Sequence, residues 1–399
     1  MSKRIEAIVK PDLLIWARES AGFTKEDAAH KLGVKLQKLE DWEEGVSRPT
    51  IKQLRKLGKQ YKRPIAVFYL DEKPIDFQPL RDFRRIIGSV GFQQPVQLNF
   101  EIRQAIYRRQ VALNLIEDLY GEPPGFEHEI SITDDPEKVG SKIRNILKVD
   151  AEKQKKGTGG KYGAFNLWRT AIESVGVLVF QSTGVDVTEM RGFSINEFSL
   201  PVIVLNSGDT PNGRIFTLLH EFAHIMLKEG GICDLNEGYD LPPEKRRIEI
   251  FCNHVAGAAL IPKQELLNED VVIRKTDKNS WTDDELSTLA KQFKVSEEVV
   301  LRRLLIYGLT TNSFYETKRR EFRKRYEMIS KEPRRGFAPP DIMAISRAGR
   351  AFVKLVLDSY YQEKITSSDL SDYLGVKLTH LPKIEDKMMS KQVRFGGLF

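Results

Sequence analysis

The stretch 217–229, TLLHEFAHIMLKE, holds two histidines four residues apart, with a glutamate directly after the first. Residues four apart lie on one face of an α-helix, so His220 and His224 can direct their imidazole nitrogens at a single ion. Glu221 would place a carboxylate beside a water molecule on that ion. His-Glu-x-x-His on a helix is the zinc protease signature. The alternative is a structural histidine pair, because so short a motif also recurs by chance.

The residues around this motif predict a helix with defined ends. Apolar side chains flank both histidines, Gly213 precedes the helix, and the Gly230–Gly231 pair stops it. The apolar run 201–206, PVIVLN, predicts a strand immediately before the helix.

A second predicted helix carries a third candidate ligand. The segment 248–262, IEIFCNHVAGAALIP, is Ala-rich and amphipathic. A catalytic zinc takes three protein ligands and keeps one position open, and Glu249 is the carboxylate best placed to complete a His2Glu set. The alternative for Glu249 is a solvated first-turn carboxylate favoured by the helix dipole. Asn253, one turn later, would orient a ligand imidazole through a hydrogen bond.

Together, the segments 191–207, 215–227 and 249–262 resemble the ImmA/IrrE family of metallopeptidases, over about residues 95–310. The resemblance implies zinc ligation by His220, His224 and Glu249, with Glu221 as the general base. Zinc would lower the pKa of its water to about 7 and polarise the scissile carbonyl, while Glu221 carries the proton to the leaving amine. The implied substrate is a repressor or antitoxin protein, in phage, mobile-element or stress regulation.

A separate motif occupies residues 11–70, where the sequence predicts four or five short helices. Thr24 would cap the second helix, with Asp27 at the capping-box position. Ala29 and Gly33 fit the tight crossing of a helix-turn-helix. The resemblance is to the Xre/Cro-type helix-turn-helix family, over about residues 8–70, and the residues that carry it are Thr24, Ala29, Gly33, Val34, Trp42, Glu43, Gly45, Pro49 and Thr50.

The second helix of this motif is a poor electrostatic fit to DNA. The candidate DNA contacts are Lys35, Gln37 and Lys38 on that helix and Arg48 and Lys52 beside it. Phosphate binds Lys and Arg, and four acids oppose it here: Glu40, Asp41, Glu43 and Glu44. Two uses of the domain stay open, namely DNA binding, tighter in a homodimer across two half-sites, and a retained fold that makes protein contacts.

The composition argues against a membrane or secreted protein. No apolar run approaches the ~18 residues of a membrane-spanning helix, and the N-terminus lacks a signal-peptide core. Cys233 and Cys252 are the only cysteines and lack metal-type spacing, so we expect reduced thiols and a cytoplasmic protein. The formal net charge of +7 permits a polyanionic partner but is spread thinly over 399 residues.

The predicted fold class is α+β and mainly helical. The predicted parts are a helix-turn-helix domain at 1–72, a connector at 73–95, a zincin-like metallopeptidase core at 96–265, a helical extension at 266–330 and a C-terminal helical domain at 331–399. In the core, strands at 176–182 and 201–206 form a small sheet, residues 186–193 turn, and zinc lies at the sheet edge. Segment 151–163 is expected to be a solvated loop, 281–309 a helix-turn-helix that packs on the peptidase, and 316–327 a solvated basic face.

Two functions remain open at this point. The first is a zinc endopeptidase that its helix-turn-helix brings to DNA or to a DNA-bound repressor. The second is a DNA-binding regulator or toxin–antitoxin component whose zinc domain senses or scaffolds. An intact Glu221 favours the first, because a purely structural site has no need of that acid.

Overall fold

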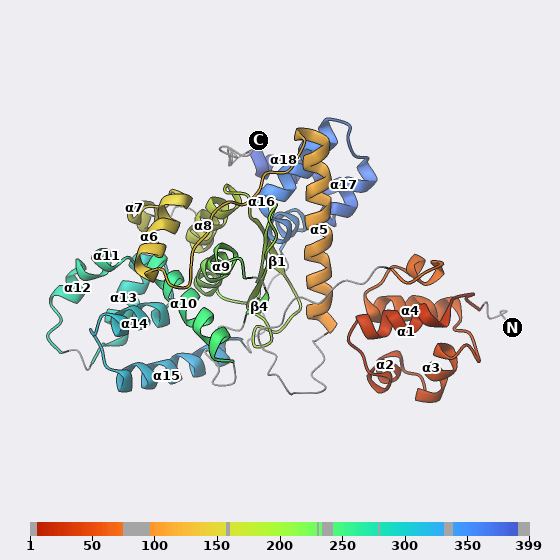
Figure 1. Cartoon of the computed structure of the whole chain (residues 1–399), viewed down its shortest axis with the longest axis horizontal. Helices are drawn as coiled ribbons and strands as arrows, with labels where there is room; N and C mark the ends of the chain where they lie inside the picture. Colours follow the sequence, from red (N-terminus) through yellow and green to blue (C-terminus); the bar gives the residue numbers. More distant parts are fainter. Residues whose placement is uncertain are drawn as a thin grey trace. The chain divides into compact units, whose positions relative to one another are not determined.

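The computed structural model describes residues 6–74, 96–156, 160–229, 231–233, 242–277, 280–330 and 338–389. These residues divide into two compact units, one containing the described residues up to 107 and the other those from 108 onward (Figure 1). Almost all of the connector predicted at 73–95 lies outside the described residues.

The first unit is the predicted bundle of short helices. Its elements are α1 (Pro11–Ser20), α2 (Lys25–Leu32), α3 (Leu36–Glu43), α4 (Ile51–Tyr61), the 3-10 helix η1 (Ile65–Tyr69) and the start of α5 (Val96–Tyr120). The Thr24 hydroxyl accepts a hydrogen bond from the Asp27 backbone N–H at 3.0 Å, which confirms the predicted cap. Gly33 then ends α2 with a φ of 64°, a left-handed conformation that glycine adopts without strain.

A buried ion pair joins α1 to α3 in this unit. Arg18 Nε donates to Glu43 Oε1 at 2.7 Å and its terminal nitrogen to Oε2 at 3.1 Å, and Glu43 is only 4% exposed. The prediction that Glu43 opposes DNA phosphate is therefore wrong. Its position on the helix puts it next to Leu39 and Trp42 on the core-facing side of α3.

The second unit is built around a four-stranded sheet. The strands are β1 (Leu178–Ser182), β2 (Gly192–Ile195), β3 (Val202–Asn206) and β4 (Gly231–Cys233), in the spatial order β1-β3-β2-β4. β1 and β3 pair in parallel, and β2 pairs antiparallel with both β3 and β4. The sequence predicted β1 and β3 but assigned the beginning of β2 to a turn.

Helices surround this sheet, and the predicted mainly helical α+β class is confirmed. After α5, they are α6 (Pro136–Leu147), α7 (Ala151–Lys156), η2 (Gly160–Tyr162), α8 (Gly163–Glu173), α9 (Pro211–Met226), α10 (Pro243–Leu260), α11 (Lys263–Leu267), α12 (Asp270–Ile273), α13 (Asp283–Phe293), α14 (Glu297–Ile306), α15 (Asn312–Ser330), α16 (Pro340–Tyr361), α17 (Ser367–Leu374), η3 (Leu378–His380) and α18 (Leu381–Met389). Within the described ranges, no helix combines the length and hydropathy that a bilayer crossing requires.

Helix α9 packs on the two inner strands of the sheet, β2 and β3, and α10 packs against α9 and α6. Figure 1 shows α9 between the sheet and the surrounding helices. Apolar residues of α8, α9 and α10 share one core with those of α13 and α14. The prediction that 281–309 packs on the peptidase core is thereby confirmed.

Of two predictions about charged segments, one needs correction. Residues 151–156 form α7 instead of a solvated loop, because the buried amide of Gln154 donates to the backbone carbonyls of Leu260 and Phe293. The basic run on α15 is largely exposed, as predicted, and forms surface ion pairs: Arg319 pairs with Glu298 at 3.3 Å, and Arg325 pairs with acids at the starts of α13 and α14.

The first of the C-terminal helices lies directly on the sheet. Helix α16 packs against β1, and α17 and α18 pack against α16. Helix α16 is kinked at Gly349, whose φ of 83° is a conformation that other residues rarely adopt. The predicted division between the core, the helical extension and the C-terminal domain stays a prediction.

Candidate metal centre

The helix that carries the two histidines begins earlier than predicted. Pro211 occupies its first turn, and the Thr210 hydroxyl caps it by accepting from the Gly213 N–H at 3.0 Å. Gly213 therefore lies inside α9 instead of preceding it. The helix ends at Met226, before the glycine pair that was expected to stop it.

Three predicted ligands meet between α9 and α10. His220 Nε2 lies 3.1 Å from His224 Nε2 and 3.2 Å from Glu249 Oε2, and His224 Nε2 lies 3.4 Å from Glu249 Oε1. Glu249 is 1% exposed and sits in the second turn of α10, so the alternative of a solvated first-turn carboxylate is wrong.

This donor set fits a zinc ion. Zinc binds imidazole nitrogen and carboxylate oxygen at about 2.0–2.1 Å in tetrahedral geometry, which places neighbouring ligand atoms about 3.3 Å apart. The three separations found here are close to that spacing. A buried carboxylate between two imidazole nitrogens is also an arrangement that a cation stabilises.

Glu221 lies on the side of α9 that faces β2. A Cβ atom built on Gly192 of β2 would come 3.4 Å from Glu221 Oε1 and 2.6 Å from Thr217 Cγ2, so only glycine fits there. Glu221 thus lies against an inner strand, and the expected position of zinc at the sheet edge stays a prediction. Burial raises the pKa of the Glu221 carboxyl, although His220, His224 and the Ser194 hydroxyl oppose that rise.

Asn253 does not make the hydrogen bond expected of it. Its side chain is buried, and neither amide atom has a hydrogen-bond partner among the described residues. The Cys252 thiol, one residue earlier, interacts with His224 instead. Burial raises the pKa of the Cys252 thiol, and the contact with His224 opposes that rise. Cys252 lies three residues after Glu249, a helical spacing that places both on one face of α10.

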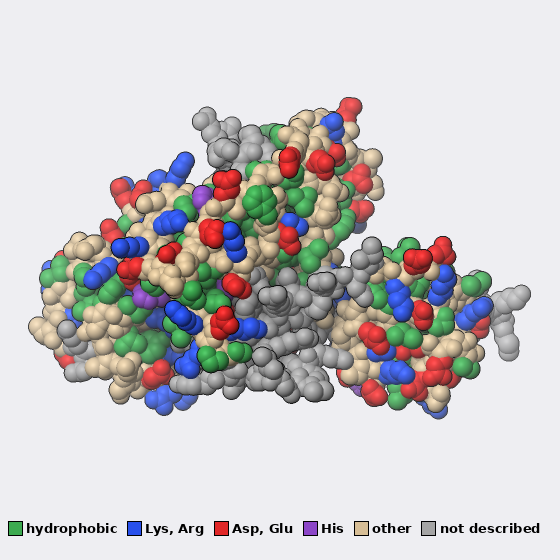
Figure 2. All heavy atoms as spheres, viewed as in Figure 1, with side chains coloured by type: hydrophobic (Ala, Val, Ile, Leu, Met, Phe, Trp, Pro, Cys, Tyr) green, Lys and Arg blue, Asp and Glu red, His purple; other side chains and the backbone are tan. Residues whose placement is uncertain are grey.

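The candidate DNA contacts are all exposed in the first unit: Lys35, Gln37, Lys38, Arg48 and Lys52. Nearby acids are partly engaged, because Gln37 donates to Asp41 at 3.2 Å and Lys25 pairs with Glu40 at 3.5 Å. Figure 2 shows basic and acidic side chains interspersed on the visible face. The positive net charge therefore does not gather into one patch on that face.

Comparison with known proteins agrees with both resemblances. Residues 172–305 match the family model of the IrrE N-terminal-like domain, and residues 14–68 match that of a helix-turn-helix. The chain thus carries a helix-turn-helix domain and an IrrE-like domain in one polypeptide. His220, Glu221, His224 and Glu249 all lie within the IrrE-like match.

One relative is the radiation response metalloprotease IrrE of Deinococcus radiodurans. It is 31% identical to this chain over 105 residues, which make up 26% of this chain and 30% of that protein. The match therefore spans about a third of the relative's length.

Proposed function

We propose that this chain is a zinc-dependent endopeptidase that cleaves a repressor or antitoxin protein. The observation that carries the proposal is the convergence of His220, His224 and Glu249 at a spacing that suits zinc, with Glu221 buried beside them. The match to the IrrE-like domain and the similarity to a metalloprotease support the same chemistry.

In this proposal, His220, His224 and Glu249 hold the zinc, and Glu221 moves the proton. Zinc, when bound, polarises a scissile carbonyl and makes water more acidic. The pKa of Glu221 is raised by burial, which brings its carboxyl closer to the range in which a group both takes up and releases a proton. Glu221 would accept a proton from the attacking water and deliver it to the leaving amine.

We further propose that the helix-turn-helix domain brings the enzyme to DNA or to a DNA-bound substrate. Lys35, Gln37 and Lys38 would face the groove, and Arg48 and Lys52 would contact phosphate. A homodimer would span two half-sites and raise the affinity. The free, buried thiol of Cys252 is consistent with a reducing compartment such as the cytoplasm.

One observation favours a second function, that of a regulator whose metal only scaffolds or senses. His220, Glu221, His224 and Glu249 are each at most 1% exposed, whereas a peptidase must admit a polypeptide to its metal. Closed ligand sets are typical of structural zinc sites. In this second function, the metal would tie α9 to α10.

Metal analysis and a matched pair of variants test the proposal. We expect about one zinc per chain in the wild type and in Glu221→Gln, and none in the His220→Ala/His224→Ala double variant. Full zinc occupancy in the double variant would sink the ligand assignment. Proteomics of cells should show a cleaved protein with wild type and with the exposed control Glu244→Gln, but not with Glu221→Gln. Identical proteomes for wild type and Glu221→Gln would favour the scaffold function.

A further inference from the structure

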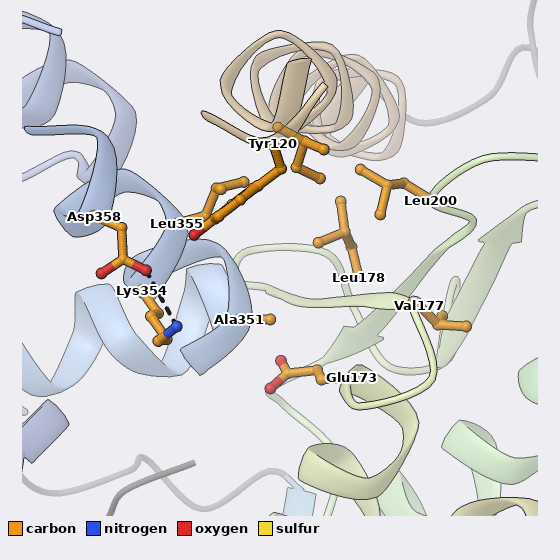
Figure 3. Close-up of a pocket in the computed structure, with 11 residues that line it drawn as sticks. Tyr120, Glu173, Val177, Leu178, Leu200, Ala351, Lys354, Leu355 and Asp358 are labelled. Carbon is orange, nitrogen blue, oxygen red and sulfur yellow. Dashed lines mark ion pairs between the residues drawn. The ribbon is translucent and has the colours of Figure 1, made fainter. Parts of the chain in front are cut away.

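The second unit contains a cavity that shares no residue with the metal centre. It lies between the end of α5, the end of α8, β1 and α16 (Figure 3). Its volume is about 30 Å³, which corresponds to roughly two or three water positions. Most of its wall is apolar and is formed by Ile116, Val177, Leu178, Leu200, Ala351 and Leu355.

A buried carboxylate lines this apolar space, and one of its oxygens lacks a hydrogen bond of good geometry. Glu173, at the end of α8, is 2% exposed and lies across the cavity from Tyr120 (Figure 3). Its Oε1 accepts from Arg169 Nε at 3.2 Å, and a Cβ built on Gly349 would come 2.5 Å from that oxygen. Among the described residues Oε2 makes no hydrogen bond of good geometry, although the backbone N–H of Ala351 also acts on this carboxylate. A buried acceptor that is incompletely satisfied is costly, so this oxygen can take a donor from the cavity.

The charges around the cavity narrow the chemistry of that donor. Arg169 already neutralises Glu173, and the charge of Arg350 also acts on it. Arg169 and Arg350 would repel a cationic ligand, and the Glu173 carboxylate would repel an anionic one. Lys354 and Asp358, which also line the cavity, pair with each other at 3.2 Å. A neutral donor is therefore the best match.

We propose that this cavity binds a small, neutral, apolar molecule with one hydrogen-bond donor, of the class of short aliphatic alcohols, whose hydroxyl donates to Glu173 Oε2. The small volume selects a slim ligand. Such a ligand would contact α8, β1 and α16 together. Arg169 connects the site to the kinked part of α16, because it also donates to the Ser346 carbonyl at 2.9 Å. Binding would therefore stabilise the packing of α16 on β1.

Two isomeric probes test the hydrogen bond in the full chain. 1-Butanol carries a donor, whereas diethyl ether has the same atoms and only an acceptor. Methyl NMR should show saturable shifts at Ile116, Leu178, Leu200 and Leu355 with 1-butanol. Binding of the ether should be at least about tenfold weaker, since a hydrogen bond to a charged group is worth about 1.5–3 kcal/mol. No saturable shift at these methyls, or equal affinity for the two probes, would overturn the proposal.

Glu173→Gln gives the sharper test. The amide oxygen must take the place of Oε1 to keep accepting from Arg169, which turns the amide NH2 toward the cavity. The preference should then reverse, so that the ether binds at least as well as the alcohol. An unchanged preference for the alcohol would refute the assigned contact.

Two further variants keep the test valid if Glu173→Gln fails to fold. Ala351→Val adds volume to the cavity wall and should abolish the saturable shifts with 1-butanol, whereas retained binding would contradict the site. Asp341→Asn is the matched control, because Asp341 is a buried carboxylate on the same helix that pairs with Lys387 and does not line the cavity. Its affinity for 1-butanol should equal that of the wild type.

Discussion

Glu137 of α6 binds the guanidinium of a fully buried arginine, Arg303. Replacing Glu137 should be among the most damaging single changes in the second unit. Arg303 of α14 is 0% exposed, and its two terminal nitrogens donate to the Glu137 oxygens at 2.6 and 2.8 Å. Arg303 Nε donates to the Ile261 carbonyl at 3.0 Å, and His254 Nε2 shares a 2.8 Å hydrogen bond with Glu137 Oε1. This cluster joins α6, α10 and α14.

The size of the effect follows from the burial of Arg303. Removing one partner of a buried pair leaves an uncompensated charge and costs about 3–5 kcal/mol. We therefore expect Glu137→Ala to lower the free energy of unfolding of the second unit by that amount. Glu137→Gln keeps a neutral acceptor and should cost less, about 1–3 kcal/mol. Urea unfolding followed by circular dichroism measures both values.

The same pair predicts a pH dependence of defined sign. Burial alone would raise the pKa of Glu137, but hydrogen bonds from Arg303 and His254 hold it well below its usual range. A lowered folded-state pKa contributes stability above the unfolded pKa of about 4.3, and that stability is lost as the pH falls toward the folded value. The stability difference between wild type and Glu137→Gln should therefore be full near pH 6 and shrink below about pH 4.

An exposed pair on the same unit is the control. Glu152 and Lys156 form an ion pair in which both side chains are more than 70% exposed, so Glu152→Gln should change stability by no more than ~0.5 kcal/mol. A loss of less than ~1 kcal/mol in Glu137→Ala, or a difference from Glu137→Gln that stays constant down to pH 3, would refute the assigned role of this pair.

Three further predictions concern the metal, the first unit and DNA. Removal of the metal by a chelator should destabilise the second unit by about 4 kcal/mol, relative to protein in a metal concentration a thousand times the Kd for the metal. Calorimetry measures this difference. The His220→Ala/His224→Ala variant should show no effect of the chelator. Glu43→Ala leaves Arg18 buried without its partner and should cost the first unit about 3–5 kcal/mol in urea unfolding, and a loss below ~1 kcal/mol would count against this pairing. DNA binding by the chain, measured by fluorescence anisotropy, should be weak and strongly salt-dependent. The double variant Arg48→Ala/Lys52→Ala should weaken this binding about equally for all DNA sequences. Nanomolar, salt-insensitive binding would contradict this prediction.

The parts of the fold that the sequence predicted depend on local periodicity. The spacing of His220 and His224 is a property of a single helix turn, so the sequence alone places them on one face. The strands β1 and β3 are buried on both faces and begin with the apolar runs LVF and VIVL, which makes them visible as strands. The sequence did not predict β2, because this strand has only four residues, GFSI. It also begins with Gly192, where the side chains of Thr217 and Glu221 leave no room for a Cβ atom.

The wrong predictions for Glu43 and Gln154 concern side chains whose partners lie far away in the sequence. Glu43 was grouped with exposed acids, although its spacing from Leu39 and its place beside Trp42 put it on the buried face of α3. Only the structure shows that Arg18, on a different helix, neutralises it. Gln154 was likewise assigned to a loop, since its partners are backbone carbonyls at the ends of distant helices. No spacing in the sequence encodes such contacts.

Glu221 separates the two proposed functions on physical grounds. A metal that only ties α9 to α10 needs its three ligands, but it does not need a second carboxyl buried against β2. The raised pKa of Glu221 means that the cost of burial outweighs the stabilising effect of His220, His224 and Ser194. In the metal-free protein, Glu221→Gln should accordingly be as stable as the wild type or more stable, because it removes a charge that is expensive to bury. A carboxyl that is buried beside the ligands and is not one of them is better explained by proton transfer at the metal than by packing.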